Sequence, residues 1–350
     1  MQPITRRAIG RAAVMTAIGR AAVATLAGFA VLRHARGETP IELRCSLDTA
    51  PSHPRNVAFR AFLAAFEAAS GGQVKTKLFE SGSLYPDLRV ATALIQGQVE
   101  MCCPGTWTLT GFVPDIDFTQ LPALYGRTAE MVAKAVDGKA GRFVNSQIAD
   151  KLHVQVLGGW FNYGFNNWYT TKKPLNSLAD LKDMKIRSPG GSLISARIRF
   201  FGALANVTAW PDVPLAMSQG TFDGLISSDE SVNTAKLVDS GMRHALHDDQ
   251  AMIAYVPLLN QAFWNKLDPK LQETMTTLWT SHMPAWREAA VNAQRRAREV
   301  LTQQGVTVVD VPPAERDALR LRMVSGQDKI VADAHMSPEL VKLVMADVGV

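Results

Sequence analysis

Short apolar segments alternate with helix-period segments from residue 41 onward, and this alternation restricts the fold more than any other feature of the chain. The first unit predicts strands at residues 41–47, 73–79 and 99–103, with helices at residues 56–69 and 86–96. The first of these helices has a single apolar stripe, made of Ala58, Phe62, Phe66 and Ala69. Strands and helices that alternate in this way predict an α/β fold with a mainly parallel sheet.

A second unit of the same kind follows. It predicts strands at residues 154–157, around Ile186 and at residues 224–226, with a helix at residues 192–201. No internal repeat or low-complexity linker separates the two units, so we expect crossing strands, and not a flexible tether, to join them.

A long helix is predicted after the second unit. Asp268 is a suitable N-cap acid and Pro269 suits the first helical position, so the helix should begin there and run towards Gln304, with Pro284 as a candidate kink. A helix of this length would reach from one unit to the other.

The formal net charge of +5 is concentrated at one end of the chain. Residues 1–37 hold six arginines and no acid, and subtracting these six charges leaves −1 for residues 38–350. A body with this balance has no positive excess with which to neutralise a phosphate backbone. We therefore expect no nucleic-acid partner.

Residues 1–37 are typical of a cleaved export signal. A basic start precedes the apolar run at residues 21–32, and Ala35-Arg-Gly37 supplies small residues for cleavage before Glu38. The alternative is an uncleaved membrane anchor, although residues 21–32 are too few to span a bilayer. We expect a periplasmic protein.

The export route stays open between two systems. Thr5-Arg-Arg-Ala-Ile9 resembles a twin-arginine signal, but Gly10 follows where an apolar residue is usual and Arg20 interrupts the apolar run. The general secretory route therefore remains an equal alternative.

Catalytic and metal-binding motifs are scarce. The chain has no glycine-rich dinucleotide or phosphate loop, no Gly-x-Ser-x-Gly elbow and no His-Glu-x-x-His helix. Cys45, Cys102 and Cys103 lack zinc-type spacing and are predicted to be small core residues, although Cys45 would be able to pair with one of the others if their strands adjoin. We therefore predict no catalytic residues and no cofactor.

The segment His244-Ala-Leu-His247-Asp-Asp249 comes nearest to a metal site. Two imidazoles three residues apart would share one face of a helix, beside two carboxylates. A solvated loop rich in His and Asp has the same pattern, and we predict no metal.

Arg187 is the strongest candidate for a ligand contact. It ends a short apolar run and is followed by Ser-Pro-Gly-Gly191, where a strand should stop and a turn begin. The carboxyl ends of parallel strands are where α/β folds bind ligands, and a guanidinium matches a carboxylate with two parallel hydrogen bonds.

Several motifs together resemble the DctP-type solute-binding proteins of TRAP (tripartite ATP-independent periplasmic) transporters. The central ones are Leu178-Ala-Asp-Leu-Lys-Asp-Met-Lys-Ile-Arg187, then Gly202, then Val213-Pro-Leu-Ala-Met-Ser-Gln-Gly-Thr-Phe-Asp-Gly224. Ser70-Gly-Gly, Phe79-Glu-Ser-Gly-Ser-Leu84, Leu121-Pro and Leu267-Asp-Pro extend the match over nearly the whole mature chain.

The resemblance implies a periplasmic-binding-protein-like fold, in which two α/β lobes enclose a hinged cleft and a long helix spans both lobes. On this basis the expected boundaries are residues 38–160 with 250–285 for lobe I, and residues 161–249 with 286–350 for lobe II. Such a receptor binds an organic acid in the cleft and delivers it to the membrane permease subunits without transforming it.

The resemblance also assigns site residues. It implies that Arg187 grips the ligand carboxylate, that Asn167 is a second polar contact, and that Trp210 closes over the ligand. It places Ser227 at the site as well, and Trp107 in a loop of the first lobe that faces the cleft. Trp107 and Trp210 would otherwise be core aromatics, and Ser227 a plain turn residue.

Departures from the family pattern bear on the ligand. Many relatives carry arginine or glutamine at the position of Asn167, and Glu, Tyr and Gln at the positions of Asp212, Pro214 and Ser218. The loss of a second cation argues against a dicarboxylate or a sialic-acid-like ligand. A monocarboxylate with an apolar or aromatic body fits better, because five aromatic residues are expected around the cleft, namely Trp107, Trp160, Phe161, Trp168 and Trp210.

Two alternative functions remain open from the sequence. One is a ligand-binding partner of a sensor system, and the other is an exported α/β enzyme, which the twin-arginine resemblance favours. The expected function is solute reception for transport.

Overall fold

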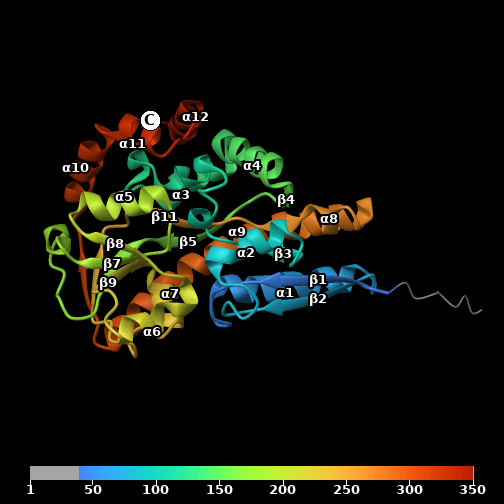
Figure 1. The fold of residues 1–350 in the computed structure, drawn as a ribbon, viewed down its shortest axis with the longest axis horizontal. Helices are drawn as coiled ribbons and strands as arrows, with labels where there is room; N and C mark the ends of the chain where they lie inside the picture. The colour runs from blue at the N-terminus through green and yellow to red at the C-terminus, as the bar shows by residue number, and fades with distance from the viewer. Residues whose placement is uncertain (1–38, 350) are drawn as a thin grey trace, which may run out of the picture. The chain divides into compact units, whose positions relative to one another are not determined.

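Two main sheets organise residues 39–349, the part of the chain that the computed structural model describes (Figure 1). The first has the order β2-β1-β3-β12-β4 and consists of β1 (Ile41–Ser46), β2 (Val74–Phe79), β3 (Met101–Cys102), β4 (Val154–Val156) and β12 (Leu258–Asn260). The second has the order β13-β10-β6-β9-β7-β8 and consists of β6 (Asn167–Thr170), β7 (Lys185–Ser188), β8 (Leu204–Val207), β9 (Gly224–Ser227), β10 (His244–His247) and β13 (Thr307–Asp310). The predicted signal peptide, residues 1–37, lies outside the described residues.

Both sheets are mixed. β1 runs parallel to β2 and β3, and β7 runs parallel to β8 and β9. β12, however, is antiparallel to β3 and β4, and β6 is antiparallel to β9 and β10. The prediction of a mainly parallel sheet is therefore wrong for these strands. The chain enters β6 and β12 directly from the other sheet. A parallel neighbour would require a crossover connection, usually a helix, and among the described residues none directly precedes these two strands.

Three segments connect the two sheets. β5 (Phe161–Phe165) leads from β4 to β6, and β11 (Met252–Tyr255) leads back from β10 to β12. The two pair with each other as an antiparallel ribbon. The third connection is helix α9 (Pro269–Gln303), which lies in the chain between β12 and β13. The expectation that crossing strands join the two units is confirmed.

Helix α9 begins where its sequence predicts. The Asp268 carboxylate accepts a hydrogen bond of 2.8 Å from the backbone N–H of Leu271, and the helix continues through Pro284. Its buried stripe changes along its length. Bulky side chains such as Trp279 pack the first half against α1 (Pro54–Ala69) and β5, whereas buried alanines line the second half, which packs against α7 (Asp229–Thr234).

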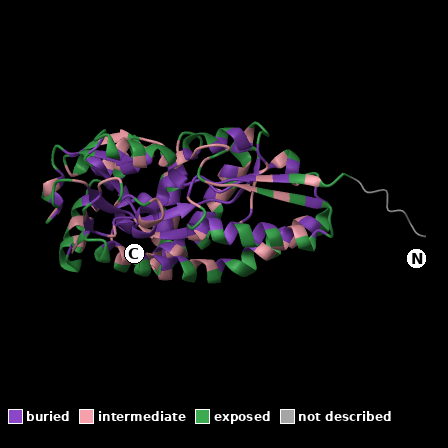
Figure 2. Ribbon diagram, turned by 90° about the horizontal axis from the view of Figure 1, so that it is seen from below, coloured by how far each residue is buried: buried purple, intermediate pink, exposed green. Residues whose placement is uncertain are grey.

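The other helices cover the sheets. In Figure 2, buried residues lie mostly in the interior of the described unit and many helix faces on its outside are exposed. These helices are α2 (Asp87–Ile95), α3 (Ala129–Asp137), α4 (Lys139–Leu152), α5 (Ser192–Phe200), α6 (Val213–Ser218), α8 (Gln261–Trp264), α10 (Pro313–Val324), α11 (Gln327–Asp333) and α12 (Pro338–Val348). Short 3₁₀ turns add η1 (Thr106–Thr108), η2 (Pro114–Gln120), η3 (Pro122–Leu124), η4 (Leu178–Leu181) and η5 (Trp210–Asp212).

The C-terminal helices pack far from their neighbours in sequence. Helix α12 lies against α3 and α4 (Figure 1) and against η2, and α10 lies against η3. These partners belong to residues 114–152, which the predicted boundaries assign to lobe I, whereas the C-terminal helices were assigned to lobe II. The lobe boundaries as a whole stay a prediction.

The described helices also bear on membrane topology. Between residues 39 and 349, no helix combines the length and the apolar character that a membrane span would require.

Candidate ligand-binding site

A small cavity of about 20 Å³ lies where the ends of several strands and their following loops meet. Four of the five predicted site residues line it, namely Arg187, Trp210, Ser227 and Trp107. Its other lining residues are Asp48, Asp87, Asn166, Pro189, Ile226, Ser231, Ile253 and Tyr255. Asp48 follows β1 of the first sheet, and Asp87 begins α2, the helix between β2 and β3 of the same sheet. Arg187 and Trp210, in contrast, come from the second sheet and its loops. Both layers therefore contribute to one site.

Arg187 lies near the carboxyl end of β7, and its side chain is 2 % exposed. Its Nε donates a hydrogen bond of 2.9 Å to the backbone oxygen of Thr208, which fixes the plane of the guanidinium. Its Cζ is 5.3 Å from the ring centroid of Trp210, within the range of a cation–π contact. Nη2 is buried and has no hydrogen-bond partner.

The charge of Arg187 survives its burial. Removal from water lowers the pKa of Arg187 to about 10, and the nearby Asp87 carboxylate counteracts part of this effect. The group therefore stays protonated near neutral pH and presents a positive charge to the cavity.

Asp87 is the first residue of α2 and faces Arg187 in the cavity. Its Oδ1 accepts a hydrogen bond of 3.1 Å from the backbone N–H of Trp210, whereas its buried Oδ2 has no partner. Burial and the neighbouring Asp48 raise the pKa of Asp87 to about 6, although Arg187 acts in the opposite direction.

Asp48 is held by a buried ion pair. Arg55 donates hydrogen bonds to the Asp48 carboxylate and to the carbonyl oxygen of Cys103, the latter at 2.9 Å. The Arg55 guanidinium also lies over the ring of Tyr255, with Cζ 4.0 Å from the centroid. Arg187, Asp48 and Asp87 thus line the cavity, and Arg55 lies behind the lining residues Asp48 and Tyr255.

The glycines after Arg187 allow close approach of the Trp107 segment. Gly190 and Gly191 have φ angles of +114° and +82°, which side chains rarely adopt. A Cβ atom on Gly191 would lie 3.1 Å from the Cβ of Trp107. The Pro-Gly-Gly turn therefore lets η1 pack against the start of α5.

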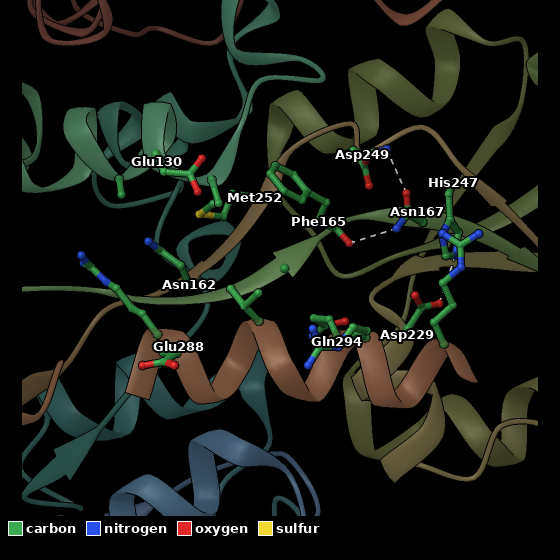
Figure 3. A pocket seen from close by; sticks show the side chains of 17 residues that line it. Glu130, Asn162, Phe165, Asn167, Asp229, His247, Asp249, Met252, Glu288 and Gln294 are labelled. Carbon is green, nitrogen blue, oxygen red and sulfur yellow. Dashed lines mark hydrogen bonds and ion pairs between the residues drawn. The ribbon is translucent and has the colours of Figure 1, made fainter. Parts of the chain in front are cut away.

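Asn167, the fifth predicted residue, lies elsewhere. Its Oδ1 accepts hydrogen bonds from the backbone N–H groups of Asp248 and Asp249, at 3.1 and 3.0 Å. It lines a separate pocket of about 550 Å³ beside α9, shown in Figure 3. Its neighbour Asn166 lines the Arg187 cavity instead, because successive residues of an extended chain point to opposite sides.

Three of the five aromatic residues expected around the cleft belong to the core. Trp160, Phe161 and Trp168 are fully buried and do not line the cavity. Their ring systems are committed to other partners: Trp160 Nε1 donates to Asn145 at 2.9 Å, and Trp168 Nε1 donates to Asp248 at 3.0 Å. The expectation of a five-membered aromatic cluster at the site is therefore wrong for these three, and only Trp107 and Trp210 of the five line the cavity.

The histidine segment has a structural role. His244 and His247 lie on strand β10, so residues three apart point to opposite faces, and these residues form neither the helix nor the loop considered from the sequence. His247 Nε2 lies 3.1 Å from Asp229 Oδ1, and its Nδ1 lies 3.3 Å from Arg298. Among residues 39–349, no cluster of three or more His, Cys, Asp or Glu side chains is arranged to hold a metal ion. Cys45, Cys102 and Cys103 are buried free thiols, which confirms their prediction as core residues.

Sequence reasoning missed the eight other lining residues, among them Asp48, Asp87, Asn166 and Tyr255. Asp48 is the second residue after β1, and Asp87 opens the helix after the matched Phe79 to Leu84 segment, so both are acids at the sheet edge where α/β folds bind ligands. That position was an available signal. Asn166 and Tyr255 lie on or beside the crossing ribbon, and no local pattern marks them.

Comparison with known proteins identifies one matching family. The model of the family described as "Bacterial extracellular solute-binding protein, family 7" (DctP) matches residues 46–333. Among curated proteins, the C4-dicarboxylate-binding periplasmic protein DctP of Rhodobacter capsulatus is 24 % identical over 80 % of this chain and 83 % of its own. The 2,3-diketo-L-gulonate-binding periplasmic protein of Escherichia coli K12 is 25 % identical over 86 % and 90 %.

Solved structures share the fold. A TRAP periplasmic solute-binding protein from Desulfovibrio salexigens, solved with bound orotic acid, superimposes with a TM-score of 0.82 at 21 % identity. The match covers 88 % of this chain and 98 % of that one. It confirms the predicted fold class of α/β lobes with a long helix.

Proposed function

Because the chain belongs to the bacterial extracellular solute-binding proteins of family 7, the DctP type, we propose that it is the solute receptor of a TRAP transporter and binds an organic acid anion in the cavity around Arg187. The three similar proteins described above are named for organic acids or were solved with one. These ligands differ from one another, so they support the class of ligand and not its identity.

The observation that carries the proposal is the state of the Arg187 guanidinium. It is almost fully buried, positively charged and oriented by Thr208, and its Nη2 has no partner among the described residues. A buried donor without a partner is costly, and a carboxylate is the anion whose shape matches the guanidinium fork. We assign Arg187 to the ligand carboxylate, with Trp210, Trp107 and Ser227 around the ligand body.

The ligand is proposed to be a monocarboxylate with an apolar body. Arg55 and Arg187 are balanced by Asp48 and Asp87, so a single carboxylate adds one negative charge to a neutral set and a second carboxylate would add another in a low-dielectric site. The apolar lining residues give stacking and packing area, namely Trp107, Trp210, Ile226, Ile253 and Tyr255.

Binding is proposed to proceed by hinge closure. A cavity of about 20 Å³ has room for about one water molecule, so an organic acid enters only if the surrounding elements separate. We propose that the two lobes part at the crossing ribbon and α9, and that contacts from both lobes favour closure around the ligand. No step of this cycle breaks or forms a covalent bond, and we propose that the protein is not an enzyme.

The partner and location follow from the same proposal. The closed receptor would meet the membrane permease subunits of the transporter in the periplasm. We propose that residues 1–37 direct export and are removed before Glu38. Sequencing the N-terminus of protein from the periplasmic fraction checks this, and retention of Met1 or Gln2 there would contradict it.

Arg187 variants test the proposed function. A thermal-shift screen against organic acids identifies ligands, because a compound that binds the folded state raises the melting temperature by mass action. For an acid found in this way, Arg187→Ala should weaken binding by about 2 to 4 kcal/mol, since a charged hydrogen-bonded pair loses one partner. Arg187→Lys should also bind poorly, because an ammonium group lacks the planar fork.

The matched control is Arg199→Ala, at an exposed arginine on α5. Calorimetry should give the control variant the affinity of the wild type. Wild-type affinity in Arg187→Ala would refute the assignment of the carboxylate to this residue.

A further inference from the structure

Four buried polar atoms of the cavity lining have no hydrogen-bond partner. Three are donors: Arg187 Nη2, Asn166 Nδ2 and Trp107 Nε1. The fourth, Asp87 Oδ2, is an acceptor. The four side chains are 2 %, 3 %, 8 % and 2 % exposed, in that order, so each atom loses its water on folding. Because native proteins rarely leave such atoms unpaired, the set describes the hydrogen-bonding pattern that a ligand has to match.

The three donors match one carboxylate. A carboxylate accepts at about four lone-pair sites and donates at none, so its two oxygens are able to serve Arg187, Asn166 and Trp107 together. The same carboxylate does not suit Asp87, because two ionised carboxylates at hydrogen-bond distance repel each other. The ligand therefore needs a separate donor for Asp87 Oδ2.

This donor has to lie close to the carboxylate in the ligand. Arg187 and Asp87 are anchored to the same short segment, since Arg187 Nε donates to the oxygen of Thr208 and Asp87 Oδ1 accepts from the N–H of Trp210. A hydroxyl on the carbon next to the carboxylate is the smallest group that supplies the donor there. An ammonium at that carbon would bring three donors. Among the unpartnered buried atoms of the described lining, Asp87 Oδ2 is the one acceptor, so a hydroxyl fits this lining better than an ammonium.

From this pattern we infer that the ligand is a 2-hydroxy monocarboxylic acid with an apolar substituent, and that Asp87 is the residue that selects for the hydroxyl. The inference rests on the proposed function, because it takes Arg187 as the carboxylate contact. It adds what the family assignment leaves open, which is the group beside the carboxylate and the residue that recognises it.

Matched series of acids test the inference on the wild-type protein. An aliphatic series consists of 2-hydroxy-4-methylpentanoate, 4-methylpentanoate, 4-methyl-2-oxopentanoate and leucine. An aromatic series consists of 3-phenyllactate, 3-phenylpropanoate, phenylpyruvate and phenylalanine. In at least one series, calorimetry should show the hydroxy acid binding roughly 10- to 100-fold more tightly than the acid without the hydroxyl, because the latter leaves Asp87 Oδ2 buried and unpaired. The oxo acid and the amino acid should also bind more weakly.

The variant Asp87→Asn tests the residue. An asparagine oxygen can still accept from Trp210, and the amide nitrogen would replace Oδ2 with a donor. A donor suits the carbonyl of a 2-oxo acid, whereas a hydroxyl is able to pair with either group. The preference for the hydroxy acid over the oxo acid should therefore fall by about tenfold or more. Asp150→Asn, at an exposed aspartate on α4, is the matched control and should keep the wild-type preference.

The outcomes separate the inference from the proposed function. Equal affinity for the hydroxy acids and their counterparts without the hydroxyl overturns the inference, and so does an unchanged preference in a folded Asp87→Asn variant. Failure of both series to bind overturns it as well. The proposed function survives these results if another organic acid binds and its affinity depends on Arg187. If Asp87→Asn does not fold, the comparison within the wild-type series still decides the inference.

Discussion

Asp117 is a buried carboxyl at the junction of η2 and α5. Its Oδ2 accepts a hydrogen bond of 3.4 Å from the backbone N–H of Leu193, in the first turn of α5, whereas its Oδ1 has no partner. Burial raises the pKa of Asp117 to about 7, although the Leu193 N–H and the charge of Arg197 act in the opposite direction. The folded state thus favours the protonated form of this group.

The raised pKa predicts a dependence of stability on pH. Between the ordinary pKa of an aspartate and about pH 7, the folded state binds more protons at Asp117 than the unfolded state does. The contribution of Asp117 to the free energy of unfolding is therefore fully present at low pH and is lost as the pH rises through about 7. Asparagine is neutral at every pH, so Asp117→Asn should gain stability relative to the wild type across this window, by at most about 1.4 kcal/mol per pH unit.

Denaturant unfolding of both proteins at a series of pH values measures this difference. Asp87 and Asp248 have pKa values raised to about 6, but both proteins contain them, so their effect largely cancels in the comparison. If the difference in free energy of unfolding between Asp117→Asn and the wild type stayed constant between about pH 4 and about pH 8, the assignment of the effect to Asp117 would be contradicted.

At the scale of elements, the turn between β7 and α5 combines two functions. It ends the strand that carries Arg187, and it lets the Trp107 segment approach the first turn of the following helix. Gly191 has φ of +82° and ψ of 140°, a conformation that is nearly restricted to glycine. Its absent side chain leaves space for Trp107.

Gly191→Ala should therefore destabilise the protein and weaken ligand binding. The substitution forces an unfavourable backbone conformation, at about 1 to 3 kcal/mol, and places a methyl group 3.1 Å from the Cβ of Trp107. The control is Gly71→Ala, where φ is +59° but no atom lies within 4 Å of the added Cβ. Unfolding and binding experiments should show that the control loses some stability and keeps its affinity. A Gly191→Ala protein with wild-type affinity would show that this contact has no part in binding.

At the scale of the whole described unit, buried polar contacts join the segments that follow the two sheets. His53 precedes α1 beside the first sheet, and its Nε2 lies 2.8 Å from Oε2 of Glu230 and 3.3 Å from Oγ of Ser231 on α7. Its Nδ1 accepts from the backbone N–H of Arg55 at 3.2 Å, so the ring proton belongs on Nε2, which is hydrogen-bonded to Ser231 Oγ and lies beside the Glu230 carboxylate. Ser231 also lines the cavity around Arg187. Under the proposed hinge closure, this pair would stabilise the closed arrangement.

Replacing His53 with alanine should weaken ligand binding, although His53 does not line the cavity. In the closed state, His53→Ala leaves the Glu230 carboxylate buried without its partner, whereas an open state would hydrate it. A loss on the order of 3 kcal/mol in binding free energy is expected, about 100-fold in Kd. The double variant His53→Ala with Glu230→Ala should bind more tightly than His53→Ala alone, because no unpaired carboxylate remains.

Calorimetry with an acid from the screen provides the measurement, and His282→Ala, at an exposed histidine on α9, is the control. If the double variant binds no better than His53→Ala, the pair does not act as a closing contact.

The sequence by itself determined the local elements and the most distinctive residue. Apolar periodicity located β1, α1 and β2 to within a few residues, and the acid and proline at Asp268 and Pro269 located the start of α9. These features depend on neighbours in the chain, which a single sequence displays. The family motifs also made Arg187 a candidate ligand contact, because its position at a strand end and its chemistry are both local properties.

Only the tertiary structure decided which side chains share the cavity. Asp87 and Trp210 meet across 123 residues of sequence. Asn166 lines the cavity around Arg187, whereas Asn167 lines the separate pocket, because successive residues of an extended chain point to opposite sides. The antiparallel direction of β6 and β12 in their sheets likewise follows from where the chain crosses between the sheets. Local patterns carry no information on these crossings, which is why the acceptor beside Arg187 emerged only from the folded chain.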